Sequence, residues 1–243
     1  MNRFQGTLPS WLRWETLQGY AETRGSKAMV AYPTSVEECQ NVLEFADRNA
    51  LTICPRAGGF SYADMIMNED HIVINLSRMN QVLQWDPEKG LIVVEPGVSF
   101  SEIFHRSLMH NWTLSSCPGG MGVTIGGAIS NNVHGKDSWK NGNFGDQVTQ
   151  LKLLTAAGEI VEISRDQDQN LFEAVVGGIG LLGIIVEATM QLKKIPSPFV
   201  EVSSVVTRNV EESLEQIETF NKDWDFSVAW ADAFIKGSGL GRG

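Results

Sequence analysis

The sequence predicts an α+β fold of two lobes, followed by the start of a further α+β domain. Segments rich in β-branched residues alternate with segments of helical period, which is typical of mixed folds. A glycine-dense, uncharged stretch that opens at Cys117 separates two groups of these segments. Pro196 and Pro198 then interrupt the chain, so the best domain boundary lies at 195–198.

This pattern divides the chain into an N-terminal segment, a domain of two lobes, and an incomplete third unit. The expected bounds are 1–24 for the segment, 25–195 for the domain with lobes 25–116 and 117–195, and 196–243 for the third unit.

The first lobe is expected to run as a βαβ unit, a further strand, a β-hairpin and a helix. Ser35 and Ser99 can each cap the helix that follows, because a serine hydroxyl accepts a hydrogen bond from the first helical turn. The turn 86–90, with its proline and glycine, marks the hairpin. The predicted helices are 36–49 and 99–111, and the predicted strands are 28–32, 51–55, 71–76, 82–85 and 91–95.

The second lobe and the third unit continue the alternation. Strands are predicted at 150–156, 159–163, 182–193, 199–206 and 226–234, and helices at 170–176 and 210–223. The last two strands have no further partner in the sequence, and unpaired strand edges favour association. We therefore expect the natural protein to continue, and we expect 199–234 to self-associate or to remain mobile.

The charge of the chain excludes some classes of partner. The 19 Lys and Arg residues against 29 Asp and Glu residues give a net charge of −10, which repels the phosphates of nucleic acids. Nucleic acid is therefore not expected as a partner. Any phosphate that the chain binds must be held locally, by backbone N–H groups or a few side chains.

Cysteine usage and hydropathy bear on compartment. Cys39, Cys54 and Cys117 form no CxxC pair, so neither a disulfide framework nor a zinc site is predicted, and no metal is expected. No signal peptide or transmembrane segment of about 18 apolar residues is found. We expect a reducing, cytoplasmic location.

The loop 56–62 follows a predicted strand and reads Arg56-Ala57-Gly58-Gly59-Phe60-Ser61-Tyr62. Adjacent glycines let successive N–H groups turn to one side, and such a nest of donors binds a pyrophosphate without basic side chains. A plain turn between strands is the alternative interpretation.

The stretch 118–136 contains six glycines and almost no charge. Because ordering so many glycines is entropically costly, something large is expected to lie against this backbone. A flat ring system fits, with Thr124, Ser130 and Asn131 as polar contacts. His134 and Lys136 lie at the end of the stretch, where a loop can present them to a ligand.

The segment 178–183 matches GxGxxG, but its context contradicts a dinucleotide fingerprint. That fingerprint needs a strand before it and a helix opening inside it. Here a helix is predicted before the segment and a strand after it, so an NAD(P)-dependent dehydrogenase is not favoured.

These motifs resemble the flavoproteins of the vanillyl-alcohol oxidase and p-cresol methylhydroxylase (PCMH) type, across 25–195. Loop 56–62 resembles that family's pyrophosphate loop, 118–136 the segment that lies along the flavin, and 176–185 the stretch that meets the adenine half. The resemblance implies a two-lobed PCMH-type FAD-binding domain followed by the start of a truncated α+β substrate (cap) domain.

The resemblance also implies which residues hold FAD. They are Arg56, Ala57, Gly58, Gly59, Phe60, Ser61, Tyr62, Pro118, Gly119, Gly120, Thr124, Gly127, Ser130, Asn131, Val133, His134, Gly180, Gly183 and Ile185. Many relatives attach the flavin covalently through a His just after the paired glycines. Phe60 stands there and no Cys lies beside His134, so FAD is expected to bind non-covalently.

Within the family, the chain is similar to members that oxidise a polyprenyl-phosphate pentose. This likeness rests on 124–129, 133–136, 142–145, 227–232 and 240–243. It implies hydride transfer from a secondary alcohol of a sugar or sugar-like substrate to the flavin, with His134 and Lys136 near the substrate. A lipid-linked substrate would bring peripheral membrane contact.

The principal base is expected beyond residue 243, so this chain alone is expected to be catalytically silent. The electron acceptor is not indicated, and a reductase partner is one option. The alternative from another class is a non-catalytic module that binds FAD or another nucleotide.

Overall fold

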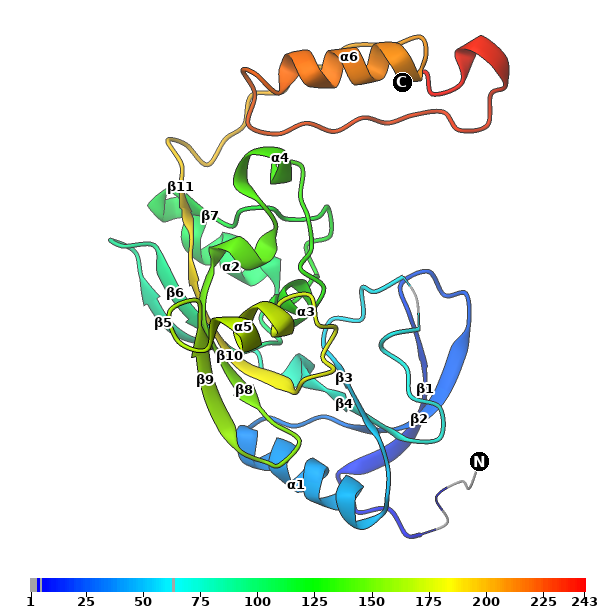
Figure 1. The fold of residues 1–243 in the computed structure, drawn as a ribbon, viewed down its shortest axis with the longest axis vertical. Coiled ribbons are helices and arrows are strands. Elements are labelled where there is room, and N and C mark those ends of the chain that lie inside the picture. Colours follow the sequence, from blue (N-terminus) through cyan, green and yellow to red (C-terminus); the bar gives the residue numbers. More distant parts are fainter. Residues whose placement is uncertain (1–3, 5, 63) are drawn as a thin grey trace.

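The computed structural model describes residue 4, residues 6–62 and residues 64–243. Two sheets and several short helices form a body, and a C-terminal segment that carries α6 (Val210–Phe220) stands at one end of it (Figure 1). The mixed α+β fold class is confirmed.

The first sheet has four strands in the order β1-β2-β4-β3. Their bounds are Leu12–Gln18 for β1, Gly25–Ala31 for β2, Ile72–Asn75 for β4 and Ile53–Arg56 for β3. β2, β4 and β3 run parallel, whereas β1 pairs antiparallel with β2. Because β1 precedes residue 25, part of the expected N-terminal segment belongs to this sheet.

The helix α1 (Val36–Arg48) packs against both sheets. It begins as predicted, since Ser35 Oγ accepts a hydrogen bond from Glu38 N at 3.2 Å. Its buried residues Val42 and Ala46 share one apolar cluster with Ile184 and Val186 of the second sheet. The two sheets therefore form one packed body around α1.

The second sheet is antiparallel, in the order β5-β6-β10-β8-β9. Its strands are Val82–Asp86, Leu91–Val94, Ile184–Gln191, Val148–Leu154 and Ile160–Ser164 in that order. The hairpin β5–β6, expected in the first lobe, pairs through β6 with β10, which was expected in the second lobe. Local periodicity identifies a strand but not its distant partner.

The remaining elements of the body are short. They are α2 (Phe100–Ser107), β7 (Trp112–Thr113), α3 (Ile125–Ser130), α4 (Ser138–Asn141), α5 (Gln169–Val175) and β11 (Lys193–Lys194). The helix α3 lies inside the glycine-dense stretch, where no helix was expected. Packing overrides the low helix propensity of glycine there, because Ile125, Ala128 and Ile129 are fully buried.

The C-terminal segment differs from expectation. The helix α6 is present, but 199–206 and 226–234 are not strands. Only isolated backbone pairs form, such as Thr207 N to Gly243 O at 2.7 Å and Asp232 N to Arg242 O at 2.9 Å. A ladder needs a continuous neighbouring strand, and the described residues provide none on either side of this segment.

Candidate cofactor site

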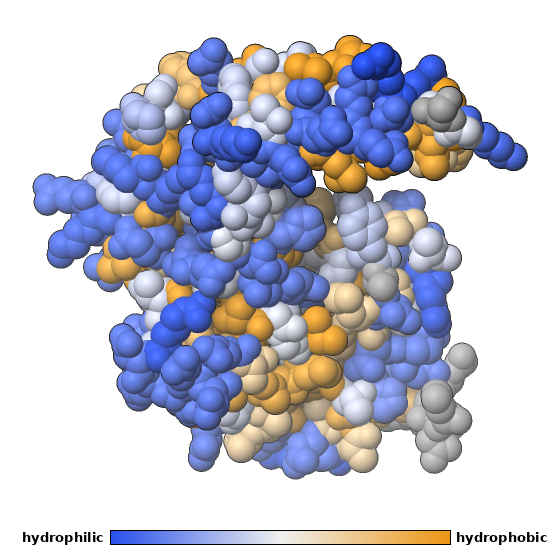
Figure 2. Space-filling model, turned by 45° about the horizontal axis from the view of Figure 1, so that its top comes forward, coloured by the Kyte–Doolittle hydropathy of each residue, from blue (hydrophilic) through white to orange (hydrophobic). Residues whose placement is uncertain are grey.

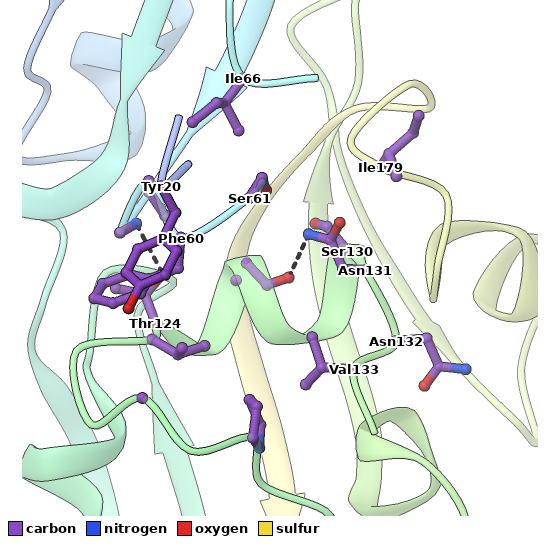
Figure 3. Close-up of a pocket in the computed structure, with 18 of the residues that line it drawn as sticks. Tyr20, Phe60, Ser61, Ile66, Thr124, Ser130, Asn131, Asn132, Val133 and Ile179 are labelled. Atoms are coloured by element: carbon purple, nitrogen blue, oxygen red, sulfur yellow. Dashed lines mark hydrogen bonds between the residues drawn. The ribbon is translucent and has the colours of Figure 1, made fainter. Parts of the chain in front are cut away.

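A cavity of about 910 Å³ lies where the two sheets meet the glycine-rich segments. This volume is near the upper end of the roughly 300–1,000 Å³ that is usual for ligand pockets. Its walls come from 55–62, 117–136 and 179–185, and Ser227 and Val228 of the C-terminal segment complete them. Figure 3 shows Tyr20 and Phe60 side by side at one end, with Ser130, Asn131 and Val133 further along.

Loop 56–62 begins at the last residue of β3, and only some of its backbone donors are used within the protein. Gly58 N donates to Thr124 Oγ1 at 3.0 Å, which ties the loop to the start of α3. Within the described residues, the N–H groups of 59–62 donate to no acceptor. Free amides at a cavity wall are suited to an anionic group, as the nest of donors predicted from sequence requires.

Arg56 supplies a positive charge to the same wall. Its Nη1 donates to Gln18 O at 3.1 Å, and it forms no ion pair within the described residues. Burial lowers the pKa of the Arg56 guanidinium, yet an arginine stays charged at neutral pH. Gly59 beside it has φ +74°, a backbone conformation that favours glycine.

The opposite wall exposes bare backbone. A Cβ added at Gly119 would meet no protein atom within 4 Å, and one at Gly127 would meet only Thr124 Oγ1 at 3.3 Å. Side chains at these two positions would therefore occupy the cavity rather than the protein interior. The lack of side chains there suits a flat ligand packed against the chain.

The end of α3 is held by one hydrogen bond from segment 178–183 and by one within its own last turn. Ile179 N donates to Ser130 O at 2.8 Å, and Asn131 Nδ2 donates to Gly127 O at 2.8 Å. The Nδ2 group of Asn131 is thus used within the helix end. Ile179 has φ +48°, a conformation that is strained for a β-branched residue.

His134 and Lys136 both line the cavity, and neither side chain has a partner among the described residues. Gly135 between them approaches the chain closely, since a Cβ there would lie 2.5 Å from Ser116 C. The backbone of the C-terminal segment is fixed beside them, because Ser227 N donates to Lys136 O at 2.9 Å. A salt bridge from Lys140 Nζ to Asp225 Oδ1 at 2.6 Å adds to this contact.

The segment 178–183 is not a dinucleotide fingerprint, as predicted. α5 ends before it at Val175, and β10 begins after it at Ile184. Gly180 (φ +79°) and Gly183 (φ +148°) adopt conformations that favour glycine, and both line the cavity with Ile185.

All residues that the sequence analysis assigned to FAD or substrate line this one cavity. Their roles as ligands remain predictions. Other lining residues were not assigned from the sequence: Tyr20, Pro55, Met65, Ile66, Leu76, Pro96, Cys117, Val123, Gly126, Asn132, Gly135, Ile179, Ser227 and Val228. Those outside the glycine-rich segments are brought to the site by tertiary packing, and no local motif marks them.

Cys117 also lines the cavity, but its thiol is poorly suited to covalent attachment. Burial, with a smaller effect of Asp137, raises the pKa of Cys117 well above its usual range. A thiol is nucleophilic as the thiolate, so Cys117 is unreactive at neutral pH.

Two further findings concern metal binding and membrane-spanning helices. Over the described ranges, no cluster of three or more His, Cys, Asp or Glu side chains is arranged to hold a metal ion. Among the residues that the structure describes, no helix is both long enough and apolar enough to cross a membrane.

Comparison with known proteins identifies the class. Residues 27–164 match the family described as FAD binding domain, and the chain belongs to this family. It is a flavoprotein domain of the oxidoreductases of the PCMH type, and its cofactor is FAD, as the resemblance predicted.

Individual relatives refine this assignment. The chain is 31% identical over 229 residues to decaprenylphosphoryl-beta-D-ribose oxidase of Mycolicibacterium smegmatis, covering 93% of this chain and 50% of the relative. It is 31% identical over 212 residues to L-gulonolactone oxidase of Mus musculus, covering 85% of this chain and 48% of the relative. The chain therefore spans about half the length of these curated relatives. The expected likeness to oxidases of a polyprenyl-phosphate pentose is confirmed.

Proposed function

We propose that this chain binds FAD non-covalently in the cavity and forms the cofactor-binding part of an oxidoreductase that oxidises a secondary alcohol of a sugar or sugar-like substrate. The observation that supports it best is a large cavity with free amides on one wall and bare glycine backbone on the other. An acidic chain with this cavity can hold a diphosphate without a basic face.

The residues divide by the part of the cofactor that they would contact. The amides of 59–62 and the Arg56 guanidinium would hold the diphosphate, because those amides donate to no acceptor and the guanidinium forms no ion pair within the described residues. Gly119 and Gly127 would leave room for the flavin ring, and 179–185 would border the adenine half. When bound, FAD supplies the capacity to accept a hydride.

His134 and Lys136 would orient the substrate, since their side chains are unpartnered and reach the cavity. As hydrogen-bond donors, both can bind hydroxyl or phosphate oxygens of a sugar derivative. A pentose linked to a polyprenyl phosphate is the substrate we propose, because the relative from Mycolicibacterium smegmatis is named for such a compound.

Non-covalent binding follows from Phe60 and Cys117. The Phe60 ring packs against the glycine loop, 2.7 Å from the position of a Cβ on Gly122, and Cys117 is held as an unreactive thiol. The test is acid precipitation of the FAD-loaded protein. Yellow flavin should remain in the supernatant, whereas a yellow pellet would show a covalent bond.

Binding and activity need separate measurements. Titration of the chain with FAD, followed by flavin fluorescence, should give a saturable site. In the whole protein, a sugar derivative with a secondary alcohol, such as a pentose linked to a polyprenyl phosphate, should bleach the flavin absorbance under anaerobic conditions. If FAD binds saturably but no such sugar derivative bleaches the flavin, a non-catalytic FAD-binding module would be favoured instead.

A further inference from the structure

The connection between β1 and β2 reaches the cofactor cavity. Tyr20 lies in this connection and lines the cavity, although it precedes 27–164, the part that matches the FAD binding domain family. The family match therefore assigns no role to it. The inference below rests on the proposed function.

Two hydrogen bonds fix this part of the chain to loop 56–62. Tyr20 N donates to Ser61 O at 2.9 Å, and Arg56 Nη1 donates to Gln18 O at 3.1 Å. One contact holds the far end of the loop, and the other holds its first residue. The loop is thus attached near both ends, to Tyr20 itself and to Gln18.

Ring contacts add a second attachment. Tyr20 stacks on Phe60, with ring centroids 5.4 Å apart and an interplanar angle of 24°. It also meets Tyr62 edge to face, at 5.5 Å and 88°. Figure 3 shows the Tyr20 and Phe60 rings lying together beside Thr124.

Phe60 in turn touches the glycine loop of the opposite wall. A Cβ on Gly122 would lie 2.7 Å from Phe60 Cζ, and a Cβ on Gly120 would lie 3.6 Å from Phe60 Cδ1. Tyr20, Phe60 and the 120–122 backbone therefore form a continuous series of contacts across one end of the cavity.

Burial in the core does not explain these rings. Tyr20 is 56% exposed, Phe60 37% and Tyr62 72%. The Tyr20 hydroxyl has no partner among the described residues, so its ring, and not its hydroxyl, makes the side-chain contacts. Exposed aromatic residues that pack on one another at a cavity rim are typical of a binding surface.

We propose that Tyr20 is a positioning residue for FAD, which clamps Phe60 so that loop 56–62 stays against the 118–124 backbone. The loop amides are then fixed before the cofactor arrives, and a site that is ordered in advance loses less entropy on binding. The cofactor site extends to the N-terminal hairpin.

The test compares Tyr20→Ala with Tyr20→Phe. Each protein, free of cofactor, is titrated with FAD, and the exchange of backbone amides in 57–62 is followed by mass spectrometry. Tyr20→Ala should bind FAD about tenfold more weakly, because two ring contacts are lost. Its loop amides should also exchange faster. Tyr20→Phe keeps the ring and should match the parent in both measurements.

Phe199→Ala is the matched control. Phe199 is 86% exposed, lies outside the cavity and has no ring partner among the described residues, so its loss should change neither measurement. Amides of β8 report whether each variant is folded. Parental affinity and exchange in a folded Tyr20→Ala would overturn the proposal. If the parent itself fails to bind FAD, the proposed function is wrong, and loop exchange still tests the clamp.

Discussion

Gly127 leaves bare backbone on the wall of the cavity, and this single residue tests the fit of the cofactor. A Cβ there would meet only Thr124 Oγ1, at 3.3 Å, so a side chain requires a shift of this hydroxyl by a few tenths of an ångström. The space that a side chain would take is the space assigned to the flavin.

We therefore expect Gly127→Val to weaken FAD binding about 10- to 100-fold, the range that overfilling a packed site costs. The melting temperature of the cofactor-free protein should hardly change, because valine displaces little of the protein. Gly127→Ala should have a smaller effect on affinity. A Gly127→Val protein with parental affinity would place the flavin elsewhere.

Ile179 is the second informative residue, because its backbone is strained. Its φ of +48° is rare for a β-branched residue, and strain of this kind gathers at functional sites. The side chain lines the cavity and is 42% exposed. We infer that the strain presents an apolar side chain to the adenine half of FAD.

Replacement by asparagine separates strain from binding. Asparagine tolerates the left-handed conformation, so Ile179→Asn should raise the free energy of unfolding of the cofactor-free protein by about 1 kcal/mol. FAD affinity should fall about three- to tenfold, because an apolar wall is lost. Leu181→Asn is the control: Leu181 is 80% exposed and outside the cavity, and we expect neither effect. Unchanged affinity in Ile179→Asn would leave the strain without a role in binding.

At the scale of elements, the helix α6 receives little support from tertiary packing. No residue of α6 is buried, and its stability rests on local interactions such as Asn209 Oδ1 accepting from Glu212 N at 2.9 Å. An isolated helix of 11 residues is marginal in water.

We accordingly expect amides of α6 to exchange at least about 100-fold faster than those of β10, which is largely buried. Hydrogen exchange read by mass spectrometry measures both in one sample. Equal protection in α6 and β10 would mean that another surface covers α6 in solution.

The same contrast explains which elements the sequence could predict. α1 and α2 combine a helical period with a serine cap, Ser35 or Ser99, and both begin at the predicted cap. α1 ends one residue before its predicted end, whereas α2 ends at Ser107, four residues before its predicted end at 111. The pairing of β6 with β10 joins segments about 90 residues apart and has no local signal. The strands expected at 199–206 and 226–234 have suitable residues but no neighbouring strand, so they do not form.

The candidate site divides in the same way. Loop 56–62 and the stretch 118–136 were predicted because their glycines are a local signal of close backbone approach. Tyr20 was missed because β1 had not been predicted, and its position depends on the pairing of β1 with β2. Ile179 was not singled out, because an isoleucine in the sequence gives no sign of a left-handed backbone conformation.

At the scale of the whole molecule, the apolar surface gathers on the C-terminal segment. Figure 2 shows apolar side chains among the charged ones on the segment at the top of the view. The most exposed of them are Phe199, Val200, Val202, Val206, Trp230 and Phe234. An apolar surface of this kind favours association.

We expect the chain to self-associate through this surface, and the net charge of −10 sets how the association depends on salt. Repulsion between like-charged copies is screened as ionic strength rises, since the Debye length falls from about 30 Å at 0.01 M to about 10 Å at 0.1 M. Light scattering should therefore show more association at higher salt. A surface held by ion pairs would respond in the opposite direction, so the salt series separates the two kinds of contact.

A double variant, Trp230→Ser with Phe234→Ser, should reduce the association because it removes two of the most exposed rings, at 85% and 95%. Met109→Ser is the matched control, since Met109 is 83% exposed but lies on the body of the molecule. If the chain stays monomeric at every salt concentration, hydrogen exchange decides the cause. Weak protection across 199–234 would show a mobile segment, as the unpaired backbone predicts. Strong protection in a monomer would contradict both expectations and would mean that this segment is packed more completely than its exposed side chains indicate.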